Sequence, residues 1–213
     1  MTPAGIDFSL NSPAICIQTR TGLSWISLYH LDRDPALPTL KAFKLHEELT
    51  GLKAITAVRY VRQVSSKGFL ERERQKMMDA EKLAHLITDQ LQSHKVSSVA
   101  IEGFSYGSKG NSFIDMVVYN AFLRQTMIKR FGIENFHVFT PSAVKKLAGK
   151  GNCNKLYMFE AFKRDHLNDP DLRDSILWQW SQDKEFSREV PKPLDDLIDS
   201  YFVMRSLLPI PSL

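Results

Sequence analysis

Two short apolar segments near the N-terminus are separated by a polar turn and contain a single acid. Residues Ala4 to Phe8 are apolar apart from Asp7, and residues Ala14 to Ile17 are apolar at every position. A continuous apolar run is typical of a strand buried on both faces, although a buried helix gives the same pattern. An ionised carboxylate on such a strand is costly unless a positive group compensates it. The rest of the chain must therefore supply a partner for Asp7.

The composition limits the class of protein. The chain has 213 residues, 43% hydrophobic and 24% charged, which is typical of a folded globular protein. Its net charge of +4 permits a polyanionic partner without requiring one. Cys16 and Cys153 provide neither a disulfide framework nor a metal-binding spacing. Without a membrane-length apolar run or room for a signal peptide before the first strand, we expect a cytoplasmic protein with no membrane partner.

The order of the elements predicts an α/β fold. Further strands are expected over residues 23–31, 56–64, 96–101 and 135–139, and helices over residues 71–92, 112–131, 141–149 and 155–166 and after Pro193. Three strands followed by alternating strands and helices predict a mixed five-stranded sheet with helices on both faces. We expect one domain over residues 1–213, with insertions at about 32–68 and 168–190, where the pattern is weak.

Acids stand at the end of a later strand and at the start of the last helix. Glu102 ends the fourth strand, and Asp195, Asp196 and Asp199 begin the final helix at spacings that can share a face. If the first and fourth strands are parallel neighbours, about 4.8 Å apart, Asp7 and Glu102 meet at one edge of the sheet. Converging carboxylates repel one another, and their oxygens select Mg²⁺ or Mn²⁺ over zinc. The pattern therefore indicates a divalent-cation site.

Most of these acids also have an ordinary explanation. Asp195 and Asp196 suit the first turn of any helix because the helix dipole favours acids there. Glu102 could be a simple strand-end charge. Asp7 is the hardest to explain in this way, because its neighbours are apolar. The combination of the three segments favours a functional site.

At these residues the chain resembles the RuvC-type Holliday junction resolvases of the ribonuclease H-like superfamily, as a divergent phage or organellar member. The matching segments are Gly5-Ile6-Asp7, Val99 to Glu102, the basic stretch from Pro141 to Lys155 that contains Gly149-Lys150-Gly151, and the final Asp-x-x-Asp motif of Asp196 and Asp199. They occur in family order across most of the chain. The doubled acid at 195 and 196 leaves the ligand open, although the family spacing favours Asp196.

The resemblance implies a ribonuclease H-like fold and a Mg²⁺-dependent endodeoxyribonuclease of DNA recombination and repair, which resolves four-way junctions by symmetric nicks. It implies that Asp7, Glu102, Asp196 and Asp199 hold two Mg²⁺ ions, for which Mn²⁺ substitutes. One ion would activate water and the other would stabilise the leaving 3′ oxygen. Lys155 is implied to lie near the scissile phosphate. The implied location is the cytoplasm of a bacterium or a phage-infected host cell, with an organelle as the alternative.

Two further groups of residues are implied to bind branched DNA. Lys145, Lys146 and Lys150 would follow the DNA backbone, although a solvated helix face explains them as well. Phe104 and Tyr106 lie in the glycine-rich loop after the fourth strand. They either stack on a base in the opened junction or fold back onto the sheet.

The twofold symmetry of a four-way junction predicts a C2 homodimer. The helix over residues 112–131 is apolar on more than one side, so it is the candidate dimer surface, although a helix packed on two sides within the core explains it nearly as well. The apolar residues expected outside its inner stripe are Phe113, Met116, Tyr119, Phe122 and Leu123.

Three alternatives stay open. A less selective branched-DNA or flap endonuclease would use the same metal site. A catalytically silent nucleic-acid-binding module would have the same fold. An actin-like sugar kinase or ATPase also begins with an acid on a first hairpin, but its glycine-rich second phosphate loop is not evident here, and 213 residues leave little room for its duplicated halves.

Overall fold

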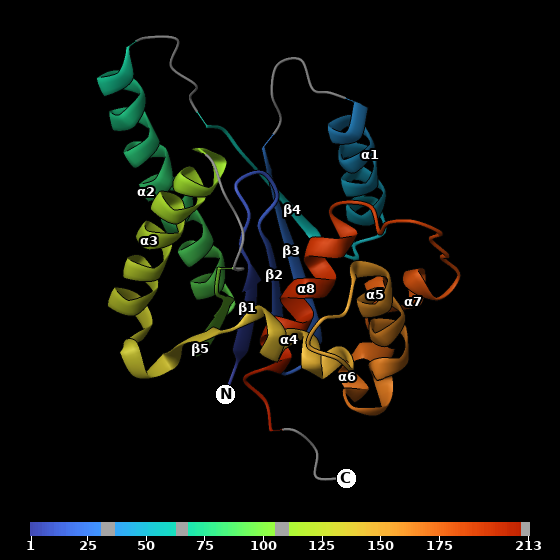
Figure 1. The fold of residues 1–213 in the computed structure, drawn as a ribbon. Helices are drawn as coiled ribbons and strands as arrows, with labels where there is room; N and C mark the ends of the chain where they lie inside the picture. The colour runs from blue at the N-terminus through green and yellow to red at the C-terminus, as the bar shows by residue number, and fades with distance from the viewer. Residues whose placement is uncertain (31–36, 63–67, 105–110, 210–213) are drawn as a thin grey trace.

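The computed structural model describes residues 1–30, 37–62, 68–104 and 111–209. One six-stranded sheet has helices on both faces (Figure 1). The strands are β1 (Pro3–Asp7), β2 (Ala14–Thr19), β3 (Gly22–His30), β4 (Thr56–Tyr60), β5 (Ser98–Glu102) and β6 (Phe136–Phe139). The α-helices are α1 (Leu37–Gly51), α2 (Phe69–Ser93), α3 (Asn111–Phe131), α4 (Pro141–Ala148), α5 (Lys155–Arg164), α6 (Pro170–Arg173), α7 (Ile176–Gln182) and α8 (Leu194–Arg205). Short 3₁₀ turns are η1 (Ile133–Asn135) and η2 (Asp165–Leu167). Within the described ranges, no helix is long and apolar enough to span a membrane.

The sheet has the order β4-β3-β2-β1-β5-β6. The pairs β1–β2 and β2–β3 are antiparallel, whereas β1–β5, β5–β6 and β3–β4 are parallel. Ile6 of β1 lies opposite Ile101 of β5, so Asp7 and Glu102 follow at the same edge of the sheet. This confirms the predicted α/β class, the mixed sheet and the parallel pairing of the two acid-bearing strands.

The predicted number of five strands was wrong. The apolar segments on either side of the first turn, counted as one hairpin element, are the separate strands β1 and β2. The turn reverses the chain completely, because the Ser12 amide donates to Ser9 Oγ at 3.0 Å and Ile6 pairs with Ile15 across it. The strand expected at 56–64 is present as β4, which lies parallel to β3 at the sheet edge.

Two regions of weak sequence pattern contain helices. Between β3 and β4, α1 brings Leu49 into the core, and Ala54 and Ile55 follow it there. The stretch 168–190, expected to be irregular, contains α6 and α7. Each of these helices begins with a side-chain cap, since Asp169 accepts from the Asp171 amide and Ser175 accepts from the Trp178 amide. The description of both stretches as insertions in a single domain stays a prediction.

The helices pack in two layers around separate cores. Helices α2 and α3 cover one face of the sheet, and α8 covers the other (Figure 1). Gly5 makes the close approach of α8 possible, because a Cβ atom there would lie 2.4 Å from the Ser200 carbonyl oxygen and nearer still to the Met204 amide nitrogen. The backbone of α8 therefore lies directly on β1 beside Asp7.

The expected faces of α2 and α3 need correction. The spacing of Met77, Ala80, Ala84, Ile87 and Leu91 predicts one buried stripe on α2, but Met77 is 51% exposed whereas the other four are buried. On α3, Tyr119 and Leu123 are buried rather than outward-facing, whereas Ile114 is 57% exposed. Because α3 is apolar on several sides, its sequence did not distinguish the face that packs against α2 and the sheet.

Candidate metal-dependent nuclease site

Acids from three distant segments meet above the carboxyl ends of β1 and β5. Successive side chains of a strand point to opposite faces, so Asp7 shares the face of Gly5, on which α8 lies. The parallel register places Glu102 beside it. The first turns of α8 supply Asp196 and Asp199, whose exposed fractions are only 3% and 7%. The chain therefore gathers four carboxylates in a largely buried position.

The four acids are incompletely neutralised. Burial raises the pKa of Asp7 well above its usual value, and the charges of Asp199 and Asp196 raise it further. Burial and then the charge of Asp199 raise the pKa of Glu102 to about 7. Burial also raises the pKa of Asp199, against the opposing effect of Lys155. A cluster of this kind favours either bound protons or an added cation.

Lys155 begins α5 and reaches into the acid cluster. The Asn154 side chain accepts from the Tyr157 amide and caps this helix. The Lys155 ammonium group donates to Asp199 Oδ2 and lies 3.8 Å from Asp195 Oδ2. Burial alone would lower the pKa of Lys155, but Asp199 and the neighbouring acids outweigh this effect and raise it. Lys155 is therefore a permanently charged group of the site.

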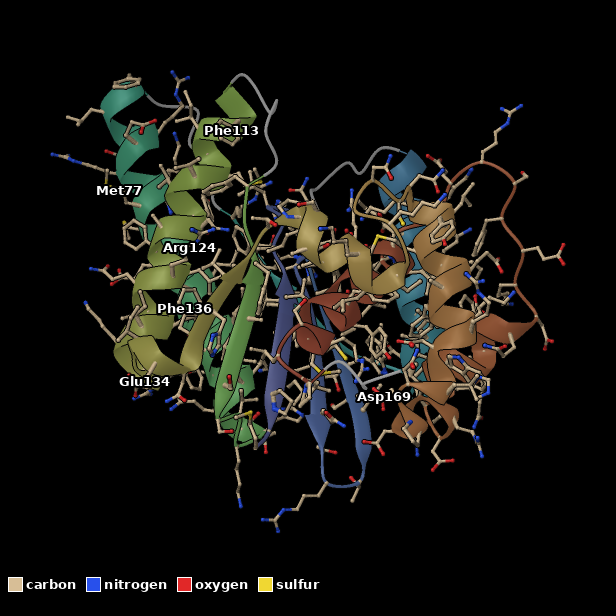
Figure 2. The ribbon with its side chains drawn as sticks, turned by 60° about the horizontal axis from the view of Figure 1, so that its bottom comes forward. Met77, Phe113, Arg124, Glu134, Phe136 and Asp169 are labelled. Carbon is tan, nitrogen blue, oxygen red and sulfur yellow. The ribbon has the colours of Figure 1, made fainter. Side chains whose placement is uncertain are left out.

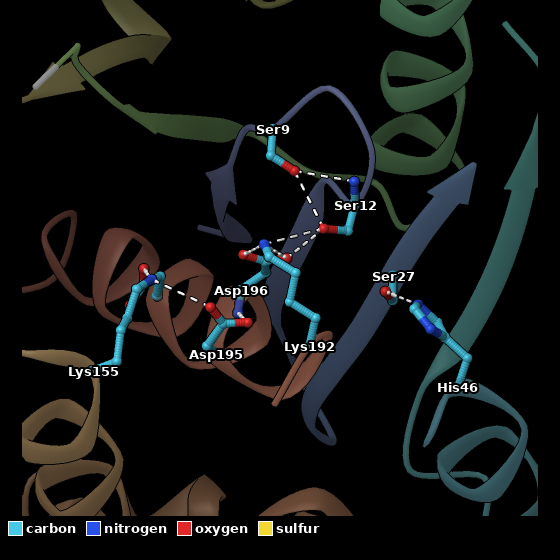
Figure 3. Close-up of polar contacts among 9 residues, drawn as sticks. Ser9, Ser12, Ser27, His46, Lys155, Lys192, Asp195 and Asp196 are labelled. Carbon is cyan, nitrogen blue, oxygen red and sulfur yellow. Dashed lines mark hydrogen bonds and ion pairs between the residues drawn. The ribbon is translucent and has the colours of Figure 1, made fainter. Parts of the chain in front are cut away.

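Ser12 and Lys192 hold Asp196 from two sides (Figure 3). Ser12 Oγ donates to Asp196 Oδ2 at 2.5 Å. The Lys192 ammonium group lies 2.7 Å from both carboxylate oxygens of Asp196 and 3.3 Å from Ser12 Oγ. The turn between β1 and β2, which follows Asp7 directly, is thus tied to the start of α8.

The two adjacent acids of α8 have different surroundings. Asp196 is buried and acts directly on the pKa of Asp7, whereas the Asp195 side chain is 12% exposed and faces Lys155. Burial and then the charge of Asp196 raise the pKa of Asp195 to about 6. Asp195 Oδ1 also accepts from the Asp196 amide at 2.9 Å. This geometry favours Asp196 as the acid that faces Asp7.

The donor set fits a hard divalent cation. Carboxylate oxygens are the ligands that Mg²⁺ prefers, and Asp199 Oδ1 is buried without a hydrogen-bond partner. In the described part of the chain, no three His, Cys, Asp or Glu side chains are already arranged around one ion position. Instead, the Lys155 ammonium group donates to a carboxylate oxygen of Asp199, and the Lys192 ammonium group donates to a carboxylate oxygen of Asp196.

The predicted DNA-binding residues lie at differing distances from the acids. Lys145 on α4 is close enough to lower the pKa values of Glu102 and Asp199, although burial and the neighbouring acids leave both values raised. Lys146 and Lys150 are exposed on α4 and on the turn that follows it.

Phe104 packs within the molecule. Its ring makes an edge contact with Phe113 at 5.7 Å, and the Arg124 guanidinium lies 5.0 Å above it. Figure 2 shows Phe113 and Arg124 on α3, on the far side of the sheet from α8. In this structure the Phe104 ring therefore packs against α3, and a contact of Phe104 with DNA stays a prediction. Tyr106 lies outside the described residues.

Ser12 and Lys192 were missed by the sequence analysis. Lys192 stands four residues before Asp196, a spacing at which side chains meet on a helix. This spacing is only a weak signal, because Lys192 lies before the first residue of α8, which is Leu194. Ser12 had been interpreted only as a turn residue, and its contact spans 184 positions of the sequence.

Comparison with solved structures identifies the fold. The chain is similar to the yeast mitochondrial Holliday junction resolvase Ydc2, with 12% identity, a TM-score of 0.50 and coverage of 94% of this chain and 75% of that one. It is also similar to Thermus thermophilus RuvC, with 14% identity, a TM-score of 0.49 and coverage of 95% of this chain and 92% of that one. For T. thermophilus RuvC in complex with a Holliday junction substrate, the identity is 11%, the TM-score is 0.48, and the coverage is 95% of this chain and 91% of that one. No family model and no curated protein sequence matches the chain. The likeness to Ydc2 confirms the expected RuvC-type fold.

Proposed function

We propose that this chain is a metal-dependent DNA endonuclease that resolves four-way junctions. The observation that carries the proposal is the convergence of four incompletely neutralised acids at one sheet edge, the buried Asp196 and Asp199 and the half-buried Asp7 and Glu102. The fold is shared with a protein described as a Holliday junction resolvase. Because one fold can support many activities, the site rather than the fold supports the chemistry.

The four acids would hold two Mg²⁺ ions, which supply an activated water and stabilise the leaving 3′ oxygen of a phosphodiester. Ser12 orients Asp196 through its hydrogen bond, and the contact of α8 with Gly5 keeps Asp196 and Asp199 over Asp7. Lys155 is charged and 42% exposed, so its ammonium group can meet a phosphate oxygen at the mouth of the site.

The DNA backbone would follow the basic end of α4. Lys145 stands beside the acids, and Lys146 and Lys150 extend the positive charge outward. Contacts of this kind release counterions, so we expect the affinity for DNA to fall steeply as the salt concentration rises. The slope of log affinity against log salt concentration should become more negative by about 0.9 for each phosphate contacted.

A panel of substrates tests the function. The protein is incubated with a labelled four-way junction, a flap and a plain duplex, each with Mg²⁺ and with EDTA. We expect cleavage of the junction in Mg²⁺ only, because junction resolution requires both the metal and the branched substrate. Similar rates on all three substrates would show a less selective nuclease. Junction binding without cleavage in Mg²⁺ or Mn²⁺ would show a silent binding module.

Removing Lys192 should tighten metal binding. Its ammonium group occupies both oxygens of Asp196, and it repels a cation placed nearby. We therefore expect Lys192→Met to raise Mg²⁺ affinity by about tenfold or more, measured by titration calorimetry at pH 8. Lys82→Met removes an exposed charge from α2, on the other side of the sheet, and should leave the affinity unchanged. Equal affinities of Lys192→Met and the wild type would show that Lys192 does not compete with the ion.

A homodimer would match the twofold symmetry of the substrate. Helices α2 and α3 expose apolar side chains near their N-terminal ends, namely Phe69, Leu70, Met77, Met78 and Ile114. The Lys76–Asp115 ion pair at 2.7 Å joins the two helices at this end of the layer, where Figure 2 shows Met77 and Phe113.

We expect light scattering to give a dimer at micromolar concentration, and Met78→Asp to give a folded monomer, because a charge in an apolar interface is costly. Leu167→Asp changes an exposed apolar residue elsewhere and serves as the control. A monomeric wild type would contradict the dimer.

A further inference from the structure

A cleft of about 490 Å³ opens beside the acid cluster. Its walls are the β1–β2 turn, the end of β3, helix α1 and the segment before α8. Ser12, Lys192 and Asp195 belong to both the cleft and the acid site, so the two are continuous. A group covalently attached to a phosphate in the acid site could therefore enter the cleft.

The far wall of the cleft is aromatic. Tyr29 of β3 lies 4.8 Å from His46 and 5.9 Å from Phe43, both on α1, measured between ring centroids. His46 is held in place, because its Nδ1 donates to the Ala42 carbonyl at 2.8 Å and its Nε2 is 2.6 Å from the buried Ser27 hydroxyl (Figure 3). A carbonyl only accepts, so Nδ1 carries a proton, and burial lowers the pKa of His46, which favours the neutral imidazole with the Ser27 hydroxyl donating to Nε2. The wall is thus a fixed set of aromatic rings.

The charged groups of the cleft are mixed. Lys41 and Lys192 are balanced by Glu189 and Asp195, so the cleft does not select a bare anion. Its volume lies within the range of about 300–1,000 Å³ that is usual for small-molecule sites. A neutral aromatic ring with an attached phosphate suits this combination better than a paired duplex, which is too large to enter.

We propose that this cleft binds one unpaired nucleotide of the DNA strand that is cut at the acid site, with its base stacked on Tyr29 and Phe43. The proposal rests on the nuclease function proposed above and adds to it the element that selects the substrate. Helix α1, which lies in the connection between β3 and β4, carries Phe43 and His46 of the aromatic wall. This connection therefore makes the protein selective for distorted DNA, in which a base is unpaired. Lys41 meets the phosphate that follows the bound base.

Cleavage and binding of a four-way junction test the proposal with matched variants. Phe43→Ala and Tyr29→Ala each remove a stacking surface, and we expect junction affinity to fall about 5- to 100-fold. Lys41→Ala, an exposed change that leaves folding intact, should weaken binding and reduce its salt dependence. Lys44→Ala and Leu52→Ala alter exposed residues of α1 and the turn after it that do not line the cleft, and should match the wild type.

A second measurement uses the unchanged protein. A single abasic nucleotide is placed in turn at each position that flanks the nick, which gives a series of junctions. At one of these positions, the abasic nucleotide should weaken binding to the same extent as Phe43→Ala. If the wild type cuts junctions, but the cleft variants and every abasic junction behave normally, the cleft proposal is overturned and the nuclease function stands. If the wild type cuts no DNA in Mg²⁺ or Mn²⁺, the nuclease function fails and the cleft proposal fails with it.

Discussion

Replacing Asp7 by Asn should strongly slow cleavage and stabilise the metal-free protein. Loss of a proposed metal ligand would cost several kcal/mol of transition-state stabilisation, so we expect the rate of junction cleavage to fall about 100- to 1,000-fold. Junction binding should persist, because the proposed phosphate contacts come from lysines and not from Asp7. Gel-shift and single-turnover cleavage measurements on one labelled junction separate the two effects.

The stability of the same variant gives an independent result. The pKa values of Asp7 and Glu102 are raised in the folded protein, that of Glu102 to about 7, whereas unfolded carboxyl groups titrate near about 4. The folded state therefore binds more protons, and its free energy of unfolding falls as pH rises from about 4 to about 7. In EDTA at pH 8, Asp7→Asn removes one repelling charge and should melt above the wild type, by about 2–4 °C for each kcal/mol relieved.

The difference in melting temperature between Asp7→Asn and the wild type should shrink as pH falls toward 4, because the wild-type acids become protonated. Asp89→Asn, an exposed change on α2, should leave both cleavage and melting unchanged. Wild-type cleavage by Asp7→Asn would show that the acid cluster is not the nuclease site. A lower melting temperature in EDTA at pH 8 would show that Asp7 is a stabilising rather than a repelled group.

Replacing Gly5 by Ala should disrupt the contact that assembles the site. The added Cβ would stand 2.4 Å from the Ser200 carbonyl oxygen, and closer to the Met204 amide nitrogen, and neither backbone atom can rotate away. We expect a loss of roughly 3 kcal/mol or more in the free energy of unfolding, and a fall in melting temperature of about 6–12 °C. Displacement of α8 would also carry Asp196 and Asp199 away from Asp7, so the folded fraction should cleave poorly.

Gly51→Ala is the matched control, because a Cβ at Gly51 meets no atom within 4 Å. It ends α1, where alanine suits a helix at least as well as glycine does. Calorimetric melting of the two variants, compared with the wild type, tests the packing. Equal melting temperatures for Gly5→Ala and Gly51→Ala would contradict the close contact of β1 with α8.

The placement of the acids could be predicted because it depends on strong, simple patterns. Short, mainly apolar segments located β1 and β5, and the long helix between them allowed a parallel crossover, so the positions of Asp7 and Glu102 followed. The first turn of α8 was marked by its acids. The Thr140-Pro141 pair also predicts a helix start, and α4 begins at Pro141 with the Thr140 side chain accepting from the Ala143 amide.

The remaining features depend on tertiary contacts that leave a weak trace in the sequence. Among the described side chains of α1, only His46 and Leu49 are buried and charged residues surround them, so the sequence shows no clear apolar periodicity there. The inner face of α3 is set by α2 and the sheet rather than by a single apolar stripe. The roles of Ser12 and Lys192 arise only when the β1–β2 turn meets α8.

Mapping the nicks on a four-way junction tests the central claim most directly. Each strand of a junction is labelled in turn, and the products formed by the wild type in Mg²⁺ are sized beside those formed in EDTA and those formed by Asp7→Asn. We predict two nicks at symmetric positions on opposing strands, in Mg²⁺ and with the wild type only. Nicks that persist in EDTA or with Asp7→Asn, or junctions that stay intact with folded wild-type protein and Mg²⁺ or Mn²⁺, would contradict the assignment of the acid cluster as a junction-cleaving site.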